Sequence, residues 1–76
     1  MTKYTKDQFE KMPVQLGGDL WNTWKLLNIV FTKTDATSIE YSLGTGLWCY
    51  AVINTVRGPE GIRVYENGSI YTNCKY

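Results

Sequence analysis

The chemically most informative residues of this chain are aromatic rings and guanidinium groups in its second half. On the strands of a sheet, such side chains can stack on the bases of single-stranded nucleic acid, and they also dominate the energetics of protein–protein interfaces. We therefore expect a binding surface, and the candidate contact residues are Trp48, Tyr50, Arg57, Arg63, Tyr65 and Tyr71.

The absence of histidine argues against catalysis. Histidine is the commonest general base in enzymes, and without it neither a Ser–His nor a Cys–His dyad can form. Glu60 and Glu66 could act as an acid and a base only if a loop and a hairpin brought them together, and we expect both to be solvated instead. Cys49 and Cys74 alone cannot complete a zinc tetrahedron. The sequence therefore predicts a protein that is not an enzyme and has neither a cofactor nor a metal.

Net charge limits the kinds of partner. Eight basic and seven acidic residues give a formal net charge of +1, which is too small for a large electrostatic footprint on duplex nucleic acid. The N-terminus lacks the apolar stretch of a secretory signal, and the longest apolar run, residues 26–31, contains Asn28. We expect a cytoplasmic protein without a membrane segment. In that compartment Cys49 and Cys74 are expected as free thiols, with a disulfide as the alternative.

A chain of this length leaves little room for a core. A domain of 76 residues buries only about 60–65% of the surface that its unfolded chain exposes, so its stability is marginal without reinforcement. Its three tryptophans, six tyrosines and two phenylalanines are more than so small a core holds easily. Some rings should therefore lie at the surface, where a patch of several rings indicates an interface. Homodimerisation would also relieve the shortage of core.

Three functions are consistent with these residues. We expect a small binding protein that binds and inhibits or modulates a partner protein, because Trp, Tyr and Arg dominate interface energetics. One alternative is binding of single-stranded nucleic acid through an aromatic sheet face, and another is binding of a nucleotide-like molecule between the subunits of an oligomer. A last strand at residues 71–76 could also pair with a second copy of the chain.

Size, near-neutral charge and the missing catalytic residues match the general profile of accessory proteins of phages and mobile elements, which would act in the host cell cytoplasm.

The elements that must position the candidate residues begin with an N-terminal helix. Thr5 is suited to be its N-cap, and Gln8 three residues later completes a capping box. The helix is expected over residues 6–12, before a proline that stops it. Phe9 and Met12 lie three residues apart and would be its buried contacts.

The next segment permits two interpretations. Gly17-Gly18 predicts a turn, and Asp19 after it could cap a second helix. Either a short helix covers residues 20–24 and a buried strand follows at residues 25–33, or one helix spans the whole stretch. We favour the strand, because the second half of the segment is rich in β-branched and aromatic residues.

A clear period-2 pattern begins at residue 37 and predicts a hairpin. A three-residue loop at Gly44-Thr45-Gly46 would place Leu43 opposite Leu47 and Tyr41 opposite Cys49. The face predicted to lie in the core contains Ile39, Tyr41, Leu43, Leu47, Cys49, Ala51 and Ile53. The opposite face contains Ser38, Glu40, Ser42, Trp48, Tyr50 and Val52, and it must be either covered by a helix or used for binding.

A second hairpin is predicted at the end of the chain. Asn67-Gly68 favours a two-residue loop, which would pair Tyr65 with Ile70 and Val64 with Tyr71. Between the hairpins, residues 57–61 contain Pro and Gly and are expected to form a loop that interrupts the strands. The predicted fold is α+β: one or two short N-terminal helices packed on a four- to five-stranded antiparallel meander. The chain is expected to be one domain, mainly helical over residues 1–24 and rich in β-structure over residues 25–76.

Overall fold

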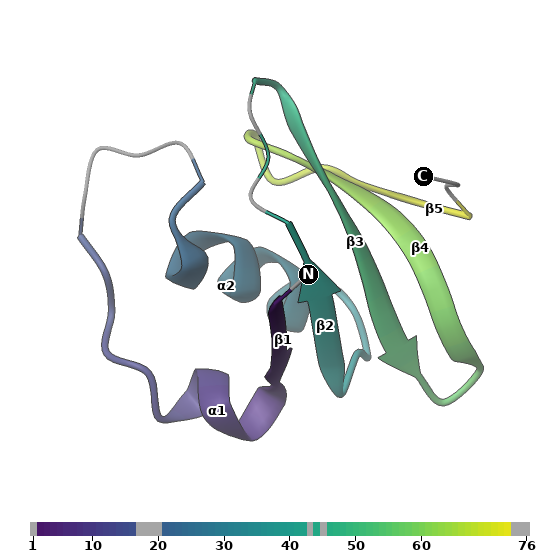
Figure 1. Ribbon diagram of the computed structural model, residues 1–76, viewed down its shortest axis with the longest axis horizontal. Coiled ribbons are helices and arrows are strands. Elements are labelled where there is room, and N and C mark those ends of the chain that lie inside the picture. The colour runs from purple at the N-terminus through teal and green to yellow at the C-terminus, as the bar shows by residue number, and fades with distance from the viewer. Residues whose placement is uncertain (1, 17–20, 43, 45, 74–76) are drawn as a thin grey trace.

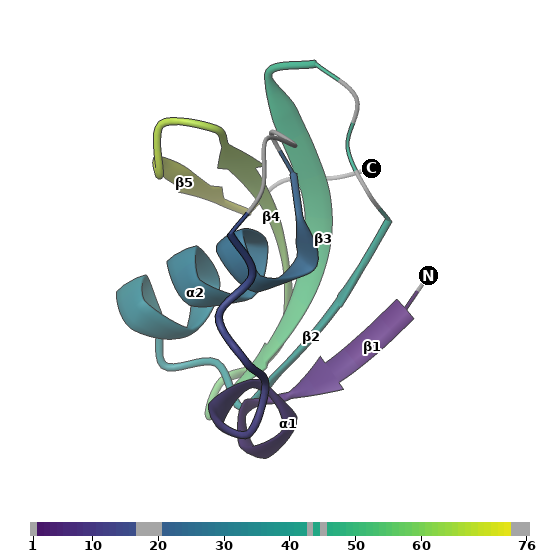
Figure 2. The same cartoon turned by 90° about the vertical axis from the view of Figure 1, so that its left-hand side faces the viewer.

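A five-stranded antiparallel sheet with helices on one of its sides forms the fold, as the computed structural model shows (Figures 1 and 2). The structure describes residues 2–16, 21–42, 44 and 46–73. Each strand pairs with its neighbours in the sequence, in the order β1-β2-β3-β4-β5. The α+β class and the antiparallel meander predicted from the sequence are therefore confirmed. The elements are β1 (Thr2–Thr5), α1 (Lys6–Glu10), α2 (Thr23–Lys33), β2 (Ser38–Tyr41), β3 (Trp48–Thr55), β4 (Gly58–Tyr65) and β5 (Ile70–Thr72).

The N-terminal helix α1 is confirmed together with its capping box. The Thr5 hydroxyl oxygen accepts a hydrogen bond from the Gln8 N–H at 3.2 Å, and the Gln8 side-chain oxygen accepts one from the Thr5 N–H at 2.8 Å. The helix ends at Glu10, slightly earlier than predicted. Phe9 and Met12 are partly buried and pack against the core, as their spacing predicts. Because α1 is so short, these tertiary contacts are what hold it in place.

The strand β1 precedes α1, and no feature of the sequence predicted it. It pairs with β2, so that Tyr4 lies opposite Ile39, and the Tyr4 ring stacks on Tyr41 with centroids 5.9 Å apart. In these four residues only Tyr4 has a large apolar side chain, so the segment lacks the alternation of apolar and polar residues that would predict a strand. Its pairing partner lies more than thirty residues away in the sequence.

The segment that follows forms one helix, α2, and the strand favoured for residues 25–33 is wrong. The Asn22 side chain caps the helix by accepting a hydrogen bond from the Lys25 N–H at 2.8 Å. The apolar residues of the segment occupy one side of a helix, where Leu26, Leu27, Val30 and Phe31 are buried. Burial of this stripe against the sheet outweighs the strand propensity of the β-branched residues. The proposed turn at Gly17-Gly18 and the cap at Asp19 lie outside the described residues.

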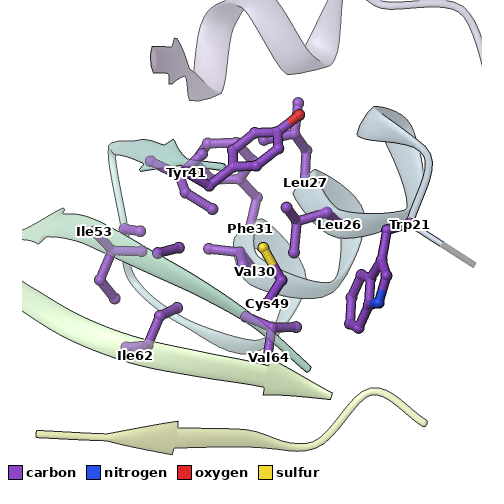
Figure 3. Close-up of a cluster of buried hydrophobic side chains, with 13 residues drawn as sticks. Trp21, Leu26, Leu27, Val30, Phe31, Tyr41, Cys49, Ile53, Ile62 and Val64 are labelled. Atoms are coloured by element: carbon purple, nitrogen blue, oxygen red, sulfur yellow. The ribbon is translucent and has the colours of Figure 1, made fainter. Parts of the chain in front are cut away.

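The hydrophobic core lies between α2 and the inner face of the sheet (Figure 3). Phe9 of α1 extends it, with its ring centroid 5.4 Å from that of Phe31. Trp21, just before α2, lies at its margin and donates a hydrogen bond from Nε1 to the Gly46 carbonyl at 3.1 Å. The buried residues are Trp21, Leu26, Leu27, Val30, Phe31, Ala36, Ile39, Tyr41, Cys49, Ala51, Ile53, Ile62 and Val64.

The two faces of β2 and β3 agree with the predicted alternation, but their register does not. Tyr41 pairs with Ala51 rather than with Cys49, so the connection is longer than a three-residue loop. A slip of two residues keeps every side chain on its face, whereas a slip of one residue would reverse the faces. Leu47, predicted in the core, lies before β3 and is 74% exposed. Leu43 and its predicted pairing lie outside the described residues.

The strands β3 and β4 form one long hairpin, so the loop predicted for residues 57–61 is wrong. The turn is limited to Val56 and Arg57, and Gly58 next to it has a φ of +104°. Pro59 lies opposite Asn54. The Asn54 carbonyl points away from β4, because it accepts a hydrogen bond of 2.8 Å from the Thr37 N–H, which lies just before β2. The pair of Pro59 and Asn54 therefore exchanges no hydrogen bonds, and the missing N–H of proline removes none from the β3–β4 ladder.

The last hairpin differs from the prediction by one residue. Arg63 pairs with Tyr71 and Val64 with Ile70, in place of the predicted pairs Val64–Tyr71 and Tyr65–Ile70. The loop has three residues, 66–68, and the Tyr65 N–H donates to the Ser69 carbonyl at 2.8 Å across it. Its last residue is a glycine with a φ of +91°, the left-handed position of a three-residue hairpin loop. The slip of one residue moves Tyr71 to the face of Arg63 and Ile70 to the core side.

Candidate functional site

The face of the sheet that points away from α2, here called the outer face, gathers five of the six candidate residues. They alternate with core residues along β3, β4 and β5. The register places Trp48 opposite Tyr65, and the two opposite neighbours of Arg63 are Tyr50 and Tyr71. Both helices lie on the other side of the sheet, so no described helix covers this face (Figures 1 and 2). We call these residues the aromatic patch: Trp48, Tyr50, Arg63, Tyr65 and Tyr71.

Contacts within the aromatic patch hold its rings in defined positions. The Arg63 guanidinium carbon lies 4.5 Å from the centroid of the Trp48 ring, a cation–π contact. The rings of Tyr65 and Tyr71 meet edge to face, with centroids 5.2 Å apart and an interplanar angle of 78°. Trp48 is 39% exposed and Tyr71 58% exposed, while the other members are partly buried. The patch is thus a preformed surface and part of it is open to solvent.

The two candidate arginines have opposite electrostatic surroundings. Arg57 lies at the β3–β4 turn, away from the patch, and forms bonds of 3.2 and 3.3 Å with Asp35 and an ion pair of 3.7 Å with Glu60. Arg63 forms no ion pair with any described carboxylate, and its buried Nε has no hydrogen-bond acceptor in the described part of the chain. The structure therefore separates Arg57 from the other candidates and leaves the charge of Arg63 without a counter-ion among the described residues.

A shallow groove of about 420 Å³ adjoins the aromatic patch. Its described lining consists of Leu47, Tyr65, Glu66 and Asn67, and a hydrogen bond of 3.3 Å from the Glu66 N–H to the Leu47 carbonyl joins its two sides. Leu47 is the residue of this region that sequence reasoning missed, because the predicted alternation assigned it to the core. Leu47 lies in the β2–β3 connection before β3, where that alternation does not apply.

The nucleophilic side chain nearest the core is unsuited to reaction. Burial raises the pKa of the Cys49 thiol, an effect larger than the opposing hydrogen bond with the backbone at Gly44. The Cys49 Sγ also donates to the Ser42 carbonyl at 2.7 Å. A protonated, buried thiol is a poor nucleophile. Cys49 is a free cysteine, whereas Cys74 lies outside the described residues. Among the residues that the structure describes, no three His, Cys, Asp or Glu side chains are grouped as metal ligands.

Neither a protein-family model, nor a curated protein, nor a solved structure matches this chain. In the described part of the molecule, no helix has the length and apolar character needed to cross a membrane. The geometry of the outer face is therefore the observation from which a function can be argued.

Proposed function

We propose that this protein is a non-enzymatic binding module that attaches to a partner protein through the aromatic patch and thereby inhibits or modulates that partner. The observation that carries the proposal is the gathering of Trp48, Tyr50, Arg63, Tyr65 and Tyr71 on a face that no described helix covers. Trp, Tyr and Arg are the residue types most enriched among the energetically dominant residues of protein interfaces.

The contacts within the patch favour tight binding because they reduce the entropy lost on association. Ordering a flexible side chain at an interface costs about 0.5–1.5 kcal/mol. Trp48 already packs against Arg63, and Tyr65 against Tyr71, before any partner is present. A partner that covers the patch therefore orders fewer side chains than it would on a flexible surface.

Single-stranded nucleic acid is the second candidate, favoured by the guanidinium stacked on Trp48. The outer face has few of the cations that such binding requires, because affinity for nucleic acid grows with the number of phosphates that cations neutralise. On the described strands of the outer face the cations are Arg63 and Lys3, and Lys3 lies directly opposite Glu40. One cation without an oppositely charged strand neighbour supports a protein partner better than a nucleic acid strand.

Affinity capture with variants tests the proposal. The immobilised wild-type protein, Trp48→Ala, Tyr71→Ala and the control Val56→Ala are exposed to a cell lysate, and retained proteins are identified by mass spectrometry. Val56 is 86% exposed at the β3–β4 turn, outside the patch. We expect one protein to be retained by the wild type and by Val56→Ala, and lost with both patch variants. Equal retention by all four would contradict the proposal.

Two further measurements separate the alternatives. Binding of a single-stranded oligonucleotide that weakens steeply with salt would favour the nucleic-acid function. A large rise in melting temperature with one nucleotide of a panel would favour a small-molecule binder. We expect neither response from the wild-type protein.

The proposed place of action is the cytoplasm, of a host cell if the chain is encoded by a phage or mobile element. The free, buried thiol of Cys49 supports a reducing compartment. A homodimer is proposed only as an additional state, through the edge strands β1 and β5. Size-exclusion chromatography with light scattering measures it directly.

A further inference from the structure

Arg63 lies at the centre of the aromatic patch, and its surroundings specify what a partner must supply. Tyr50 and Tyr71 are its neighbours on the two adjacent strands, and the Trp48 ring lies 4.5 Å from its guanidinium carbon. A guanidinium carries five N–H donors, but Nε of Arg63 is buried without an acceptor in the described residues. Any partner that covers the patch removes water from the remaining donors. Without an acceptor of its own, that partner would leave a buried, unpaired charge.

Arg63 differs from the other charged residues on the described strands of the outer face. Lys3 of β1 and Glu40 of β2 lie directly opposite each other. Arg57 is bound by Asp35 and Glu60 at the far end of the β3–β4 hairpin. Among the described strand residues of the outer face, Arg63 is therefore the charge without a neighbour of opposite sign, and electrostatic complementarity calls for an anion.

The groove beside the patch adds an apolar requirement. Its volume of about 420 Å³ is at the low end of the range for small-ligand pockets, and its wide opening to solvent suits one side chain of a larger partner. Tyr65 belongs both to the groove and to the aromatic patch, so the two features are continuous. Exposed Leu47 forms the apolar part of the lining on the β3 side.

We infer that the partner is a protein segment that places an Asp or Glu carboxylate on Arg63 and a neighbouring apolar side chain in the groove beside Leu47 and Tyr65. The inference deepens the proposed function and rests on it. The carboxylate accepts two parallel N–H bonds from the guanidinium, whose plane Trp48 already orients. The apolar side chain buries surface against the groove lining.

A second copy of the chain and a nucleic acid strand fit these observations less well. A symmetric dimer built on the patch would place the two Arg63 side chains near its two-fold axis, with like charges facing each other. A nucleic acid strand would find one uncompensated guanidinium, although its affinity depends on several phosphate contacts. A protein carboxylate needs only one guanidinium.

Selection from a random peptide library tests the inference and does not require the partner to be identified first. The library is displayed on phage and selected on the immobilised wild-type protein, on Arg63→Gln, and on the matched control Arg57→Gln. Arg57 is an arginine of the same hairpin whose charge is already compensated. We expect the wild type and Arg57→Gln to enrich peptides with an Asp or Glu at a constant spacing from an apolar residue. Arg63→Gln should enrich no such pattern.

A synthetic peptide of the enriched sequence gives the quantitative test, and it does not depend on the folding of a variant. Replacing its acidic residue by the corresponding amide should weaken binding to the wild-type protein about 10- to 100-fold, as expected for loss of a charged hydrogen-bonded pair. The same replacement should change binding to Arg63→Gln less than about threefold. In a nitrogen–proton NMR spectrum, the Nε–H signal of Arg63 should shift with the acidic peptide and not with its amide form.

Each alternative outcome has a definite meaning. Enriched peptides that need Trp48 but show no acidic residue would overturn the inference and leave the proposed function standing. Enrichment that is unaffected by Trp48→Ala, or no enrichment above background, would overturn both. A shift of the Arg63 Nε–H signal by a thymidine oligonucleotide at physiological salt, with no peptide enrichment, would replace the protein partner by nucleic acid. A dimer that dissociates in Arg63→Gln would replace it by a second copy.

Discussion

Replacing Gly68 by Ala should destabilise the protein more than the same change at another turn glycine. Gly68 closes the β4–β5 turn with a φ of +91°, and a Cβ there would lie 3.1 Å from the Lys33 Nζ. That ammonium group donates a hydrogen bond of 2.6 Å to the Gly68 carbonyl, which joins the end of α2 to the turn. Alanine must therefore adopt a left-handed backbone, and the Lys33 ammonium group must shift by a few tenths of an ångström, which strains its bond to the Gly68 carbonyl.

Both effects have expected magnitudes. A left-handed backbone costs an alanine about 1–2 kcal/mol. Losing the Lys33 bond adds about 1 kcal/mol, less than the roughly 1.5–3 kcal/mol typical of hydrogen bonds to charged groups, because the lysine is exposed. Gly58→Ala is the matched control, since Gly58 has a φ of +104° and a Cβ there meets nothing within 4 Å. We expect a loss of about 2–3 kcal/mol for Gly68→Ala and about 1–2 kcal/mol for Gly58→Ala.

Urea unfolding of four proteins measures the coupling: the wild type, Gly68→Ala, Lys33→Met and the double variant. Lys33→Met alone should cost about 1 kcal/mol. If alanine at position 68 already displaces the lysine, the double variant should be no less stable than Gly68→Ala. Additive losses, or equal losses for Gly68→Ala and Gly58→Ala, would refute the reasoning. Since this turn sets the register that places Tyr71 beside Arg63, Gly68→Ala should also weaken partner binding.

Two further predictions concern the surface rings and the response to pH. Trp48→Ala and Tyr71→Ala should leave the thermal midpoint within a few degrees, whereas Trp21→Ala, at a ring that is 6% exposed, should cost about 3–5 kcal/mol. A collapse of the fold in Trp48→Ala would assign that ring to the core. Burial raises the pKa of Cys49 and of Tyr41 above their ordinary values of 9.0 and 10.0. The unfolded chain therefore loses these protons first, so the stability is full below about pH 9 and is lost as pH rises through the folded-state pKa values. Urea midpoints measured between about pH 7 and pH 11 should fall with rising pH, and the double variant Tyr41→Phe with Cys49→Ala should fall less; identical slopes would contradict this account.

Local signals in the sequence predicted the elements whose stability is local. The Thr5 and Gln8 capping box predicted the start of α1, because both hydrogen bonds form within four residues. Alternation predicted which side chains of β2 and β3 face the core. Ile39 and Cys49 are buried, while Trp48 lies on the outer face. That alternation was sufficient to place Trp48 and Tyr50 together in the candidate site.

Residues 25–33 show where local signals were insufficient. Their β-branched and aromatic residues favour a strand, but Leu26, Leu27, Val30 and Phe31 form a buried stripe once the sheet is present. Strand propensity differs by about 1 kcal/mol between residues, which the burial of four apolar side chains exceeds. The helix is thus selected by a surface that forms from distant parts of the chain.

The aromatic content and the missing histidine are properties of the sequence alone, and the prediction of a binding surface rests on them. The alternating pattern also determines that some of those rings oppose the core. Which of these rings join the aromatic patch depends instead on long-range packing. A two-residue loop at Asn67-Gly68 would have turned Tyr71 toward the core side, whereas the observed three-residue loop places it beside Arg63. That register is held by the Lys33 contact with Gly68 and by the burial of Ile70 against the core, and neither exists until α2 has docked on the sheet.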